Sequence, residues 1–261
     1  MSHWSRITAA IALGLLLAAG AVPARAAKEK LDPDVERILK SMSAYMTSAK
    51  AFSMKADVSL EVMLRTGQKL QLCSSYSLLF RRPSEFRVAV KGKVADAEFT
   101  YDGKTLTLFG RKPNVYVQRE LAGTTDDAIR AWERETGIAA TGADLLLTQS
   151  YAILTKGVRS SDYFGVGWVN GVECHHLSLR KKNVDLQIWV RTGDQPVPMK
   201  YVITTKWMTG APQFELVLRD WDTSPEIKEG TFVFTAPAGA KKLDKVPVDE
   251  IDEFPWTKEA E

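Results

Sequence analysis

Cysteine and histidine are scarce in this chain, with two and three residues respectively among 261. Two cysteines are too few for the disulfide framework of a small secreted domain. The 35 basic and 32 acidic residues nearly balance, so the sequence gives no electrostatic case for nucleic-acid binding. Hydrophobic residues make up 45% of the chain, which excludes intrinsic disorder and collagen-like repeats. A chain of this length can therefore bury a sizeable core.

Long hydrophobic runs are absent except near the N-terminus. There, residues 7–20 are small and apolar, Arg6 precedes them, and Ala24-Arg25-Ala26 matches a signal-peptidase site. The run is shorter than the ~20 residues that span a bilayer, so we expect a signal peptide over 1–26, cleaved after Ala26, rather than a retained anchor. The mature exported protein would then have a single domain over 27–243, a charged tail over 244–261, and no transmembrane segment.

The two cysteines leave two interpretations open. Cys73 and Cys174 lie 101 positions apart, and a disulfide closing so long a loop would stabilise the fold by up to ~4.7 kcal/mol. Alternatively, both are buried thiols that pack as small hydrophobic side chains.

Three helices are predicted from periodicity and capping residues. Asp32-Pro33 is typical of a helix start, with aspartate as N-cap and proline in the first helical position. Apolar residues, Met42 and Met46 among them, then recur on one face to about residue 48. Two central helices are expected over 124–136 and 142–156, each followed by a glycine.

The rest of the chain alternates between apolar and polar residues, which predicts half-buried antiparallel strands. We expect 11–12 of them, over 52–65, 69–80, 85–91, 94–101, 104–109, 115–119, 160–169, 172–181, 184–191, 197–207, 213–220 and 231–235. A sheet that large must curl or close. The fold class is therefore mainly β (α+β): a large curled antiparallel sheet whose apolar face is covered by the helices, with room for a cavity between them.

Five runs resemble a known family of bacterial proteins, an uncharacterised "predicted periplasmic protein" domain family. They are YDGKTLTL (101–108), VNGVECHHL (169–177), DLQIWV (185–190), GDQPVPMKYVIT (193–204) and FTAPAGA (234–240). That family is similar in fold to the lipoprotein-localisation factors LolA and LolB. The resemblance implies an open half-barrel with a helical lid over a hydrophobic cavity, and a cargo of acyl chains, lipids or lipoproteins. It implies no reaction, and the family pattern has no cysteine matching Cys73.

The run Cys174-His175-His176 is the most reactive-looking part of the sequence. Neighbouring strand residues face opposite ways, so the two histidines cannot easily share a metal ion, and a zinc site needs three or four converging ligands. Cys174 and His176 share a face but are too far apart along a strand for direct activation of the thiol. We therefore expect no catalytic residue, no metal and no cofactor, with His175 hydrogen-bonded in the interior and His176 outside.

Aromatic residues and methionines are the candidates for the wall of a ligand cavity. In sequence they cannot be told apart from packed core, because both settings are apolar. Asp185, Gln187 and Trp189 share one strand face, which fits either a polar handle beside a pocket or a partly wet sheet surface. The candidate lining residues are Met42, Met46, Tyr101, Trp132, Trp189, Tyr201, Trp207 and Phe214.

Three functional hypotheses follow. The first is a non-catalytic periplasmic protein that binds a hydrophobic small molecule, lipid or lipoprotein, with residues 124–156 as the moving lid. The second is an interaction or sensor module with a filled core, whose exposed sheet edge or face binds a periplasmic or membrane protein. The third, and least favoured, is an enzyme or metal protein that depends on the cysteine and histidines.

Overall fold

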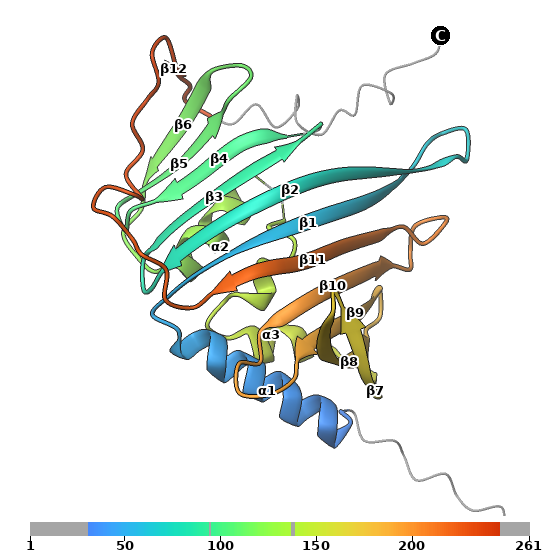
Figure 1. Cartoon of the computed structure of the whole chain (residues 1–261). Coiled ribbons are helices and arrows are strands. Elements are labelled where there is room, and N and C mark those ends of the chain that lie inside the picture. Colours follow the sequence, from blue (N-terminus) through green and yellow to red (C-terminus); the bar gives the residue numbers. More distant parts are fainter. Residues whose placement is uncertain (1–30, 94, 137–138, 246–261) are drawn as a thin grey trace, which may run out of the picture.

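A computed structural model describes residues 31–93, 95–136 and 139–245 (Figure 1). The expected signal peptide and nearly all of the expected tail lie outside these residues. The described chain forms one twelve-stranded sheet in the order β12-β6-β5-β4-β3-β2-β1-β11-β10-β9-β8-β7, antiparallel except for the parallel pair β12–β6. The strands are β1 (Ala51–Met63), β2 (Lys69–Arg81), β3 (Glu85–Gly92), β4 (Asp96–Tyr101), β5 (Thr105–Gly110), β6 (Val115–Glu120), β7 (Ser160–Val169), β8 (Val172–Arg180), β9 (Val184–Arg191), β10 (Pro198–Thr205), β11 (Gln213–Asp222) and β12 (Lys241–Lys242).

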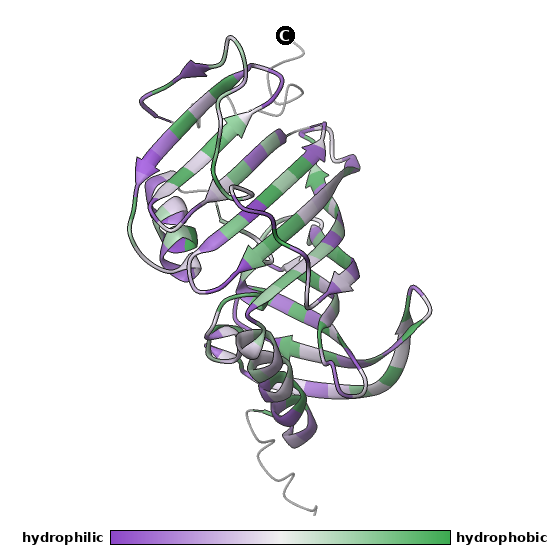
Figure 2. Cartoon of the chain, turned by 60° about the vertical axis from the view of Figure 1, so that its left-hand side comes forward, coloured by the Kyte–Doolittle hydropathy of each residue, from purple (hydrophilic) through white to green (hydrophobic). Residues whose placement is uncertain are grey.

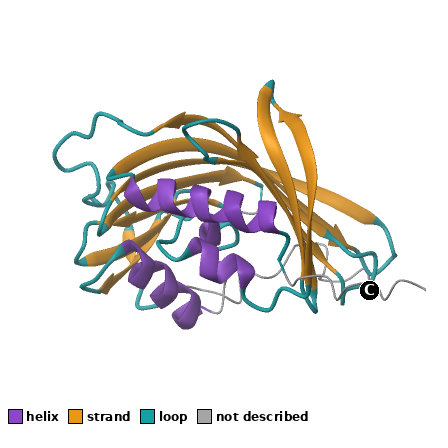
Figure 3. Ribbon diagram, turned by 90° about the horizontal axis from the view of Figure 1, so that it is seen from below, coloured by secondary structure: helices purple, strands orange, loops and turns teal. Residues whose placement is uncertain are grey.

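The helices all lie on one face of the curved sheet, which we call the inner face (Figure 3). They are α1 (Pro33–Ser48), α2 (Thr125–Thr136), the short 3-10 helix η1 (Ala143–Leu145) and α3 (Ser150–Thr155). The expected fold class is therefore confirmed: the protein is mainly β, with a large, unclosed antiparallel sheet and helices over its inner face. No helix among the described residues is long and apolar enough to cross a membrane.

Alternation along the strands explains how the sheet separates core from solvent (Figure 2). On β1, Phe52, Met54 and Ala56 are buried on the inner face, whereas Lys55 and Asp57 are exposed on the outer face. The register carries this pattern across the sheet, because residues paired on neighbouring strands share a face. Thus Phe52 pairs with Phe80, and their rings stack with 5.0 Å between centroids.

The start of α1 agrees with the sequence prediction. The Asp32 side chain accepts hydrogen bonds from the backbone N–H groups of Asp34 and Val35, at 2.9 and 3.4 Å, and Pro33 takes the first helical position. The backbone N–H of Asp32 donates to Oγ of Ser161 on β7, at 2.7 Å. The cap therefore also fixes the helix start against the edge of the sheet.

The prediction of one helix over 142–156 was wrong. The segment divides into η1 and α3, and a turn separates them. Within that turn, Thr148 donates through both its backbone N–H and its hydroxyl to Oδ2 of Asp126 on α2, at 3.1 and 2.6 Å. These tertiary hydrogen bonds replace helical ones, which ends the regular helix at this point.

The strand predicted over 231–235 was also wrong. Those residues form turns, with the N–H of Val233 bonded to the carbonyl of Gly230 at 3.0 Å. Phe232 is buried beneath the guanidinium of Arg81, and the ring of Phe234 lies 5.1 Å from that of Tyr116. The segment thus packs by its aromatic side chains, and the twelfth strand forms later, at β12.

Candidate functional site

The interior between the inner face and the helices brings four of the expected cavity residues together in one core. Met42 and Met46 project from α1, and their side chains are 0% and 1% exposed. Tyr101 on β4 and Tyr201 on β10 are equally buried beneath the helices. These side chains pack within a continuous apolar cluster, so the interior described here is filled by the protein's own residues.

Polar contacts fasten the helical layer to the sheet at the margin of this core. The Tyr201 hydroxyl donates to Oδ2 of Asp144 in η1, at 2.8 Å. The Tyr101 hydroxyl lies 3.0 and 2.9 Å from the carbonyl oxygens of Leu121 and Gly123, just before α2. In the turn between β2 and β3, Nη2 of Arg82 donates to the carbonyl of Leu146, at 2.6 Å.

Burial perturbs the titration of these marginal groups. Burial raises the pKa of Asp144 above its usual range, although the Tyr201 hydrogen bond opposes that shift. Burial also lowers the pKa of Arg82, and the charge of Asp126 partly offsets this. Oδ1 of Asp144 and Nε of Arg82 are buried without a hydrogen-bond partner among the described residues. Burying a polar atom without a hydrogen-bond partner costs free energy. These contacts between the helical layer and the sheet are therefore less stable than fully hydrogen-bonded ones.

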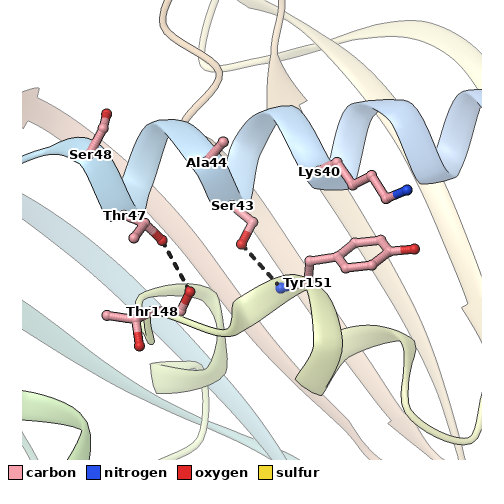
Figure 4. Close-up of a pocket in the computed structure, with 7 residues that line it drawn as sticks. All are labelled: Lys40, Ser43, Ala44, Thr47, Ser48, Thr148 and Tyr151. Atoms are coloured by element: carbon pink, nitrogen blue, oxygen red, sulfur yellow. Dashed lines mark hydrogen bonds between the residues drawn. The ribbon is translucent and has the colours of Figure 1, made fainter.

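Hydrogen bonds also join α1 to α3 within the helical layer, beside a surface pocket between the two helices (Figure 4). Oγ of Ser43 accepts hydrogen bonds from Oγ of Ser150 at 2.9 Å and from the N–H of Tyr151 at 3.3 Å. The Thr47 hydroxyl donates to the carbonyl of Thr148, at 3.1 Å. The pocket has a volume of about 430 Å³ and is lined by Lys40, Ser43, Ala44, Thr47, Ser48, Thr148 and Tyr151.

Of the other four expected cavity residues, Trp132, Trp189 and Phe214 are partly buried and pack against the same core cluster, whereas Trp207 does not. Trp132 on α2 meets Phe99 edge to face, with centroids 4.9 Å apart, and Phe214 is partly buried at the border of the core. Trp189 lies on the opposite face of β9 from the buried Ile188, where it stacks on His176 at 4.1 Å. Trp207 is 71% exposed in the turn after β10. Trp207 therefore does not belong to the interior beneath the helices, and Trp189 packs against the core cluster from the opposite face of β9.

Both cysteines are free, so the possible disulfide is not formed. Cys73 is exposed on β2, whereas Cys174 is buried on β8, and four strands lie between β2 and β8. Neighbouring strands are about 4.8 Å apart, so the two thiols are far beyond bonding distance. Burial raises the pKa of Cys174 to about 11, which keeps it a neutral thiol near pH 7.

The two histidines have separate partners. Nδ1 of His175 is hydrogen-bonded to the Tyr163 hydroxyl at 2.9 Å, and Nε2 of His176 is hydrogen-bonded to Oε1 of Gln187 at 3.0 Å. Among the described residues, no three His, Cys, Asp or Glu side chains gather closely enough to hold a metal ion.

Sequence reasoning missed the polar residues that join the layers, namely Arg82, Asp144 and Ser150. Ser43 did leave a signal, because it interrupts the buried face of α1 directly beside Met42. A polar residue in a buried helical stripe indicates a hydrogen-bond partner on another element. Asp144 left no such signal, since the periodicity of its segment predicted an ordinary helix start.

The chain belongs to the family described as "Predicted periplasmic protein (DUF2092)", whose model matches residues 35–245. This confirms the resemblance noted from the sequence. No curated protein matches the chain.

Solved structures with similar folds share little sequence with it. An uncharacterized conserved protein from Thermus thermophilus has 11% identity and a TM-score of 0.48, with 81% of this chain and 99% of that chain covered. The lipoprotein LppX from Mycobacterium tuberculosis has 8% identity and a TM-score of 0.42, with 76% and 100% covered. A LolA superfamily protein from Nitrosomonas europaea has 11% identity and a TM-score of 0.38, with 76% and 97% covered.

Proposed function

We propose that this protein is a non-catalytic periplasmic binding protein that takes up a hydrophobic ligand between the sheet and the helices. The ligand would be an acyl chain, a lipid or the lipid part of a lipoprotein. The observation that carries the proposal is the nature of the interior: an apolar core, with methionines from α1, closed on one side by a layer of helices. Methionine side chains are flexible and repack readily around different apolar shapes.

Uptake requires the helical layer to move, because the interior is filled in the form described. The layer's polar contacts with the sheet are single hydrogen bonds from side chains such as Tyr201 and Arg82, not a backbone ladder. Each buried methylene of an acyl chain contributes ~0.8 kcal/mol, so a long chain can offset the lost contacts without polar recognition.

The first test is native mass spectrometry of the protein purified from periplasm without detergent, followed by solvent extraction. A reproducible extra mass that extracts as a lipid supports the proposal and gives the class of cargo. A clean apo mass, together with no uptake of a fluorescent fatty acid, contradicts it.

A second test asks whether the layer must open. Because the Ser43 and Ser150 hydroxyls touch, S43C and S150C together, in a C73S background, would form a disulfide that joins α1 to α3. We expect the oxidised form to take up fatty acid more slowly than the same protein after reduction. Each single cysteine variant is the matched control, and equal uptake in both redox states contradicts a movement of residues 124–156 away from α1.

A second candidate function, a protein-interaction module, is favoured by the exposed apolar side chains of β7, the last strand of the sheet among the described residues. Phe164, Val166 and Trp168 are 63%, 52% and 69% exposed on this outermost strand. An exposed apolar edge strand can pair with an extended segment of another protein. Cross-linking in the periplasm from a photoreactive residue at position 168 would capture such a partner, and a clean apo mass in the first test would then favour this candidate.

Export to the periplasm also implies how the chain is organised. Residues 1–26 would be a signal peptide cleaved after Ala26, residues 27–243 the single domain, and residues 244–261 a charged tail. N-terminal sequencing of the exported protein tests the cleavage site, and a start at Ala27 is expected.

A further inference from the structure

Five turns of the sheet lie at one end of the molecule and share one sign of charge. Strand order and antiparallel pairing put the turns after β1, β3, β5, β8 and β10 along the same edge of the sheet, and we call this edge the tip rim. The turns span 64–68, 93–95, 111–114, 181–183 and 206–212. They contain seven basic residues and no acidic one: Arg65, Lys93, Arg111, Lys112, Lys181, Lys182 and Lys206.

The opposite end of the sheet has no such bias. Its hairpin turns span 82–84, 102–104, 170–171 and 192–197 and contain two basic residues, Arg82 and Lys104, and two acidic ones, Asp102 and Asp194. The charge of the tip rim is therefore a property of one end, not of turns in this protein generally.

Much of that positive charge is uncompensated. Within the described chain, Arg65, Lys93, Lys112 and Lys182 are exposed and make no ion pair. Arg111 differs, because it forms ion pairs with Asp96 at 3.1 Å and Glu98 at 2.9 Å. Lys206 differs as well, because its Nζ contacts Oδ1 of Asp185 at 2.7 Å and the carbonyl of Lys181 at 2.6 Å. That side chain joins the turn after β10 to the turn after β8.

An exposed aromatic residue stands among these charges. Trp207 is 71% exposed and its neighbour Met208 is 41% exposed, both in the turn after β10 (Figure 1). The same turn packs closely on β1, since a Cβ placed on Gly210 would come within 2.8 Å of Sδ of Met63. Trp207 is thus presented to solvent by a turn held on both sides, by Met63 and by the Lys206 contacts.

This combination fits a lipid surface better than a protein surface. Trp207 projects from a hairpin turn. It does not line the surface pocket between α1 and α3. A bilayer interface accepts a tryptophan without shape complementarity, because the ring sits at headgroup depth with its N–H in water. Lysine and arginine around it gain from the negative potential of anionic lipids.

We propose that the tip rim docks on a membrane surface containing anionic phospholipid, with Trp207 and Met208 inserted at the headgroup level and the basic turns resting on the phosphates. The strands would then stand away from the membrane, with the opposite turns pointing outward. Docking by this surface does not require a ligand in the interior, so it can stand or fall separately from the proposed binding function.

The experiment is vesicle flotation of the mature protein. We expect binding to vesicles of phosphatidylethanolamine and phosphatidylglycerol, and little binding to phosphatidylcholine alone. Raising NaCl from about 50 mM to about 500 mM should release the protein, because salt screens exposed charges. The double reversal R65E/K182E should weaken binding about tenfold or more.

Two tryptophan variants make the matched comparison. Trp207 and Trp168 are almost equally exposed, at 71% and 69%, but Trp168 lies before the turn at the opposite end of the sheet. W207S should lose vesicle binding and the blue shift of tryptophan fluorescence, and W168S should keep both. Thermal unfolding of both variants checks that neither change disturbs the fold.

Three results would overturn the proposal. The first is an equal loss of vesicle binding in W207S and W168S. The others are equal binding of the wild type to charged and neutral vesicles, and no binding of the wild type to either kind of vesicle. The last would direct attention to a protein partner for the tip rim. Fatty-acid uptake measured without vesicles separates these outcomes from failure of the proposed binding function.

Discussion

The Tyr201 hydroxyl on β10 donates a 2.8 Å hydrogen bond to Oδ2 of Asp144 in η1, and this side-chain pair is one of the contacts that join the sheet to the helical layer over the core. The carboxyl group is buried, and burial raises its pKa. Its second oxygen, Oδ1, has no hydrogen-bond partner among the described residues. The pair therefore holds the layers together at the expense of a buried carboxyl oxygen that has no hydrogen-bond partner among the described residues.

The pH dependence of this contact has a defined sign. Since the folded-state pKa of Asp144 lies above the ordinary value of 3.8, its contribution to stability is complete below that value and is lost as pH rises through the folded-state pKa. In D144N, which keeps an acceptor for Tyr201, this loss should disappear. Urea unfolding at several pH values should show the free energy of unfolding of D144N increasing relative to that of the wild type as pH rises. Parallel profiles would mean that Asp144 is solvated.

Removing the hydroxyl tests the same contact from the sheet side. Y201F should lower the free energy of unfolding by about 1–3 kcal/mol, because it leaves a buried carboxylate without its donor. Y201F combined with D144N should lose less than Y201F alone, since no charge remains unpaired. If both changes are additive, the two residues do not interact in solution.

Gly142, just before η1, sets how closely the helical layer approaches the sheet. It has φ +90°, and a Cβ there would come 2.9 Å from Cδ2 of Leu216 on β11. Gly157 has a similar φ of +74° but no atom within 4 Å of such a Cβ. G157A should therefore cost about 1–2 kcal/mol from backbone strain alone, and G142A clearly more. Urea unfolding measures both, and equal losses would contradict the close approach.

The two cysteines should react very differently. Cys73 is exposed, whereas Cys174 is buried and its pKa is raised to about 11. At pH 8, a thiol reagent such as Ellman's reagent should label one cysteine per native chain and two after unfolding. C73S should remove the native label and C174S should leave it. Native labelling of neither would instead indicate a modified or bonded Cys73.

The methionine face of α1 gives a further test of the interior. M46A should lower the free energy of unfolding by about 2–5 kcal/mol, since it removes a fully buried side chain and leaves a cavity. The same variant should take up a fluorescent fatty acid more readily if that cavity is part of the ligand site. S41A, on the exposed side of the same helix, is the control and should change neither quantity.

Local features of the sequence were enough to locate most of the elements. The N-cap at Asp32 and the apolar spacing of α1 can be recognised from one short stretch of sequence. Capping and amphipathicity depend only on neighbours within a few residues. The same holds for the hairpin turns, where Asn170 and Gly171 both adopt positive φ. Alternation then indicated an antiparallel sheet and its buried face.

Tertiary structure decided what the segments do once they meet. The hydrogen bonds of Thr148 to Asp126 break a helix that periodicity alone predicted, and aromatic packing of Phe232 and Phe234 replaces a predicted strand. Strand order, which no local pattern encodes, keeps Cys73 and Cys174 apart. The sequence by itself determined secondary structure and sheet faces through short-range physics, whereas the site, its polar contacts and the basic tip rim arise only when distant segments become neighbours.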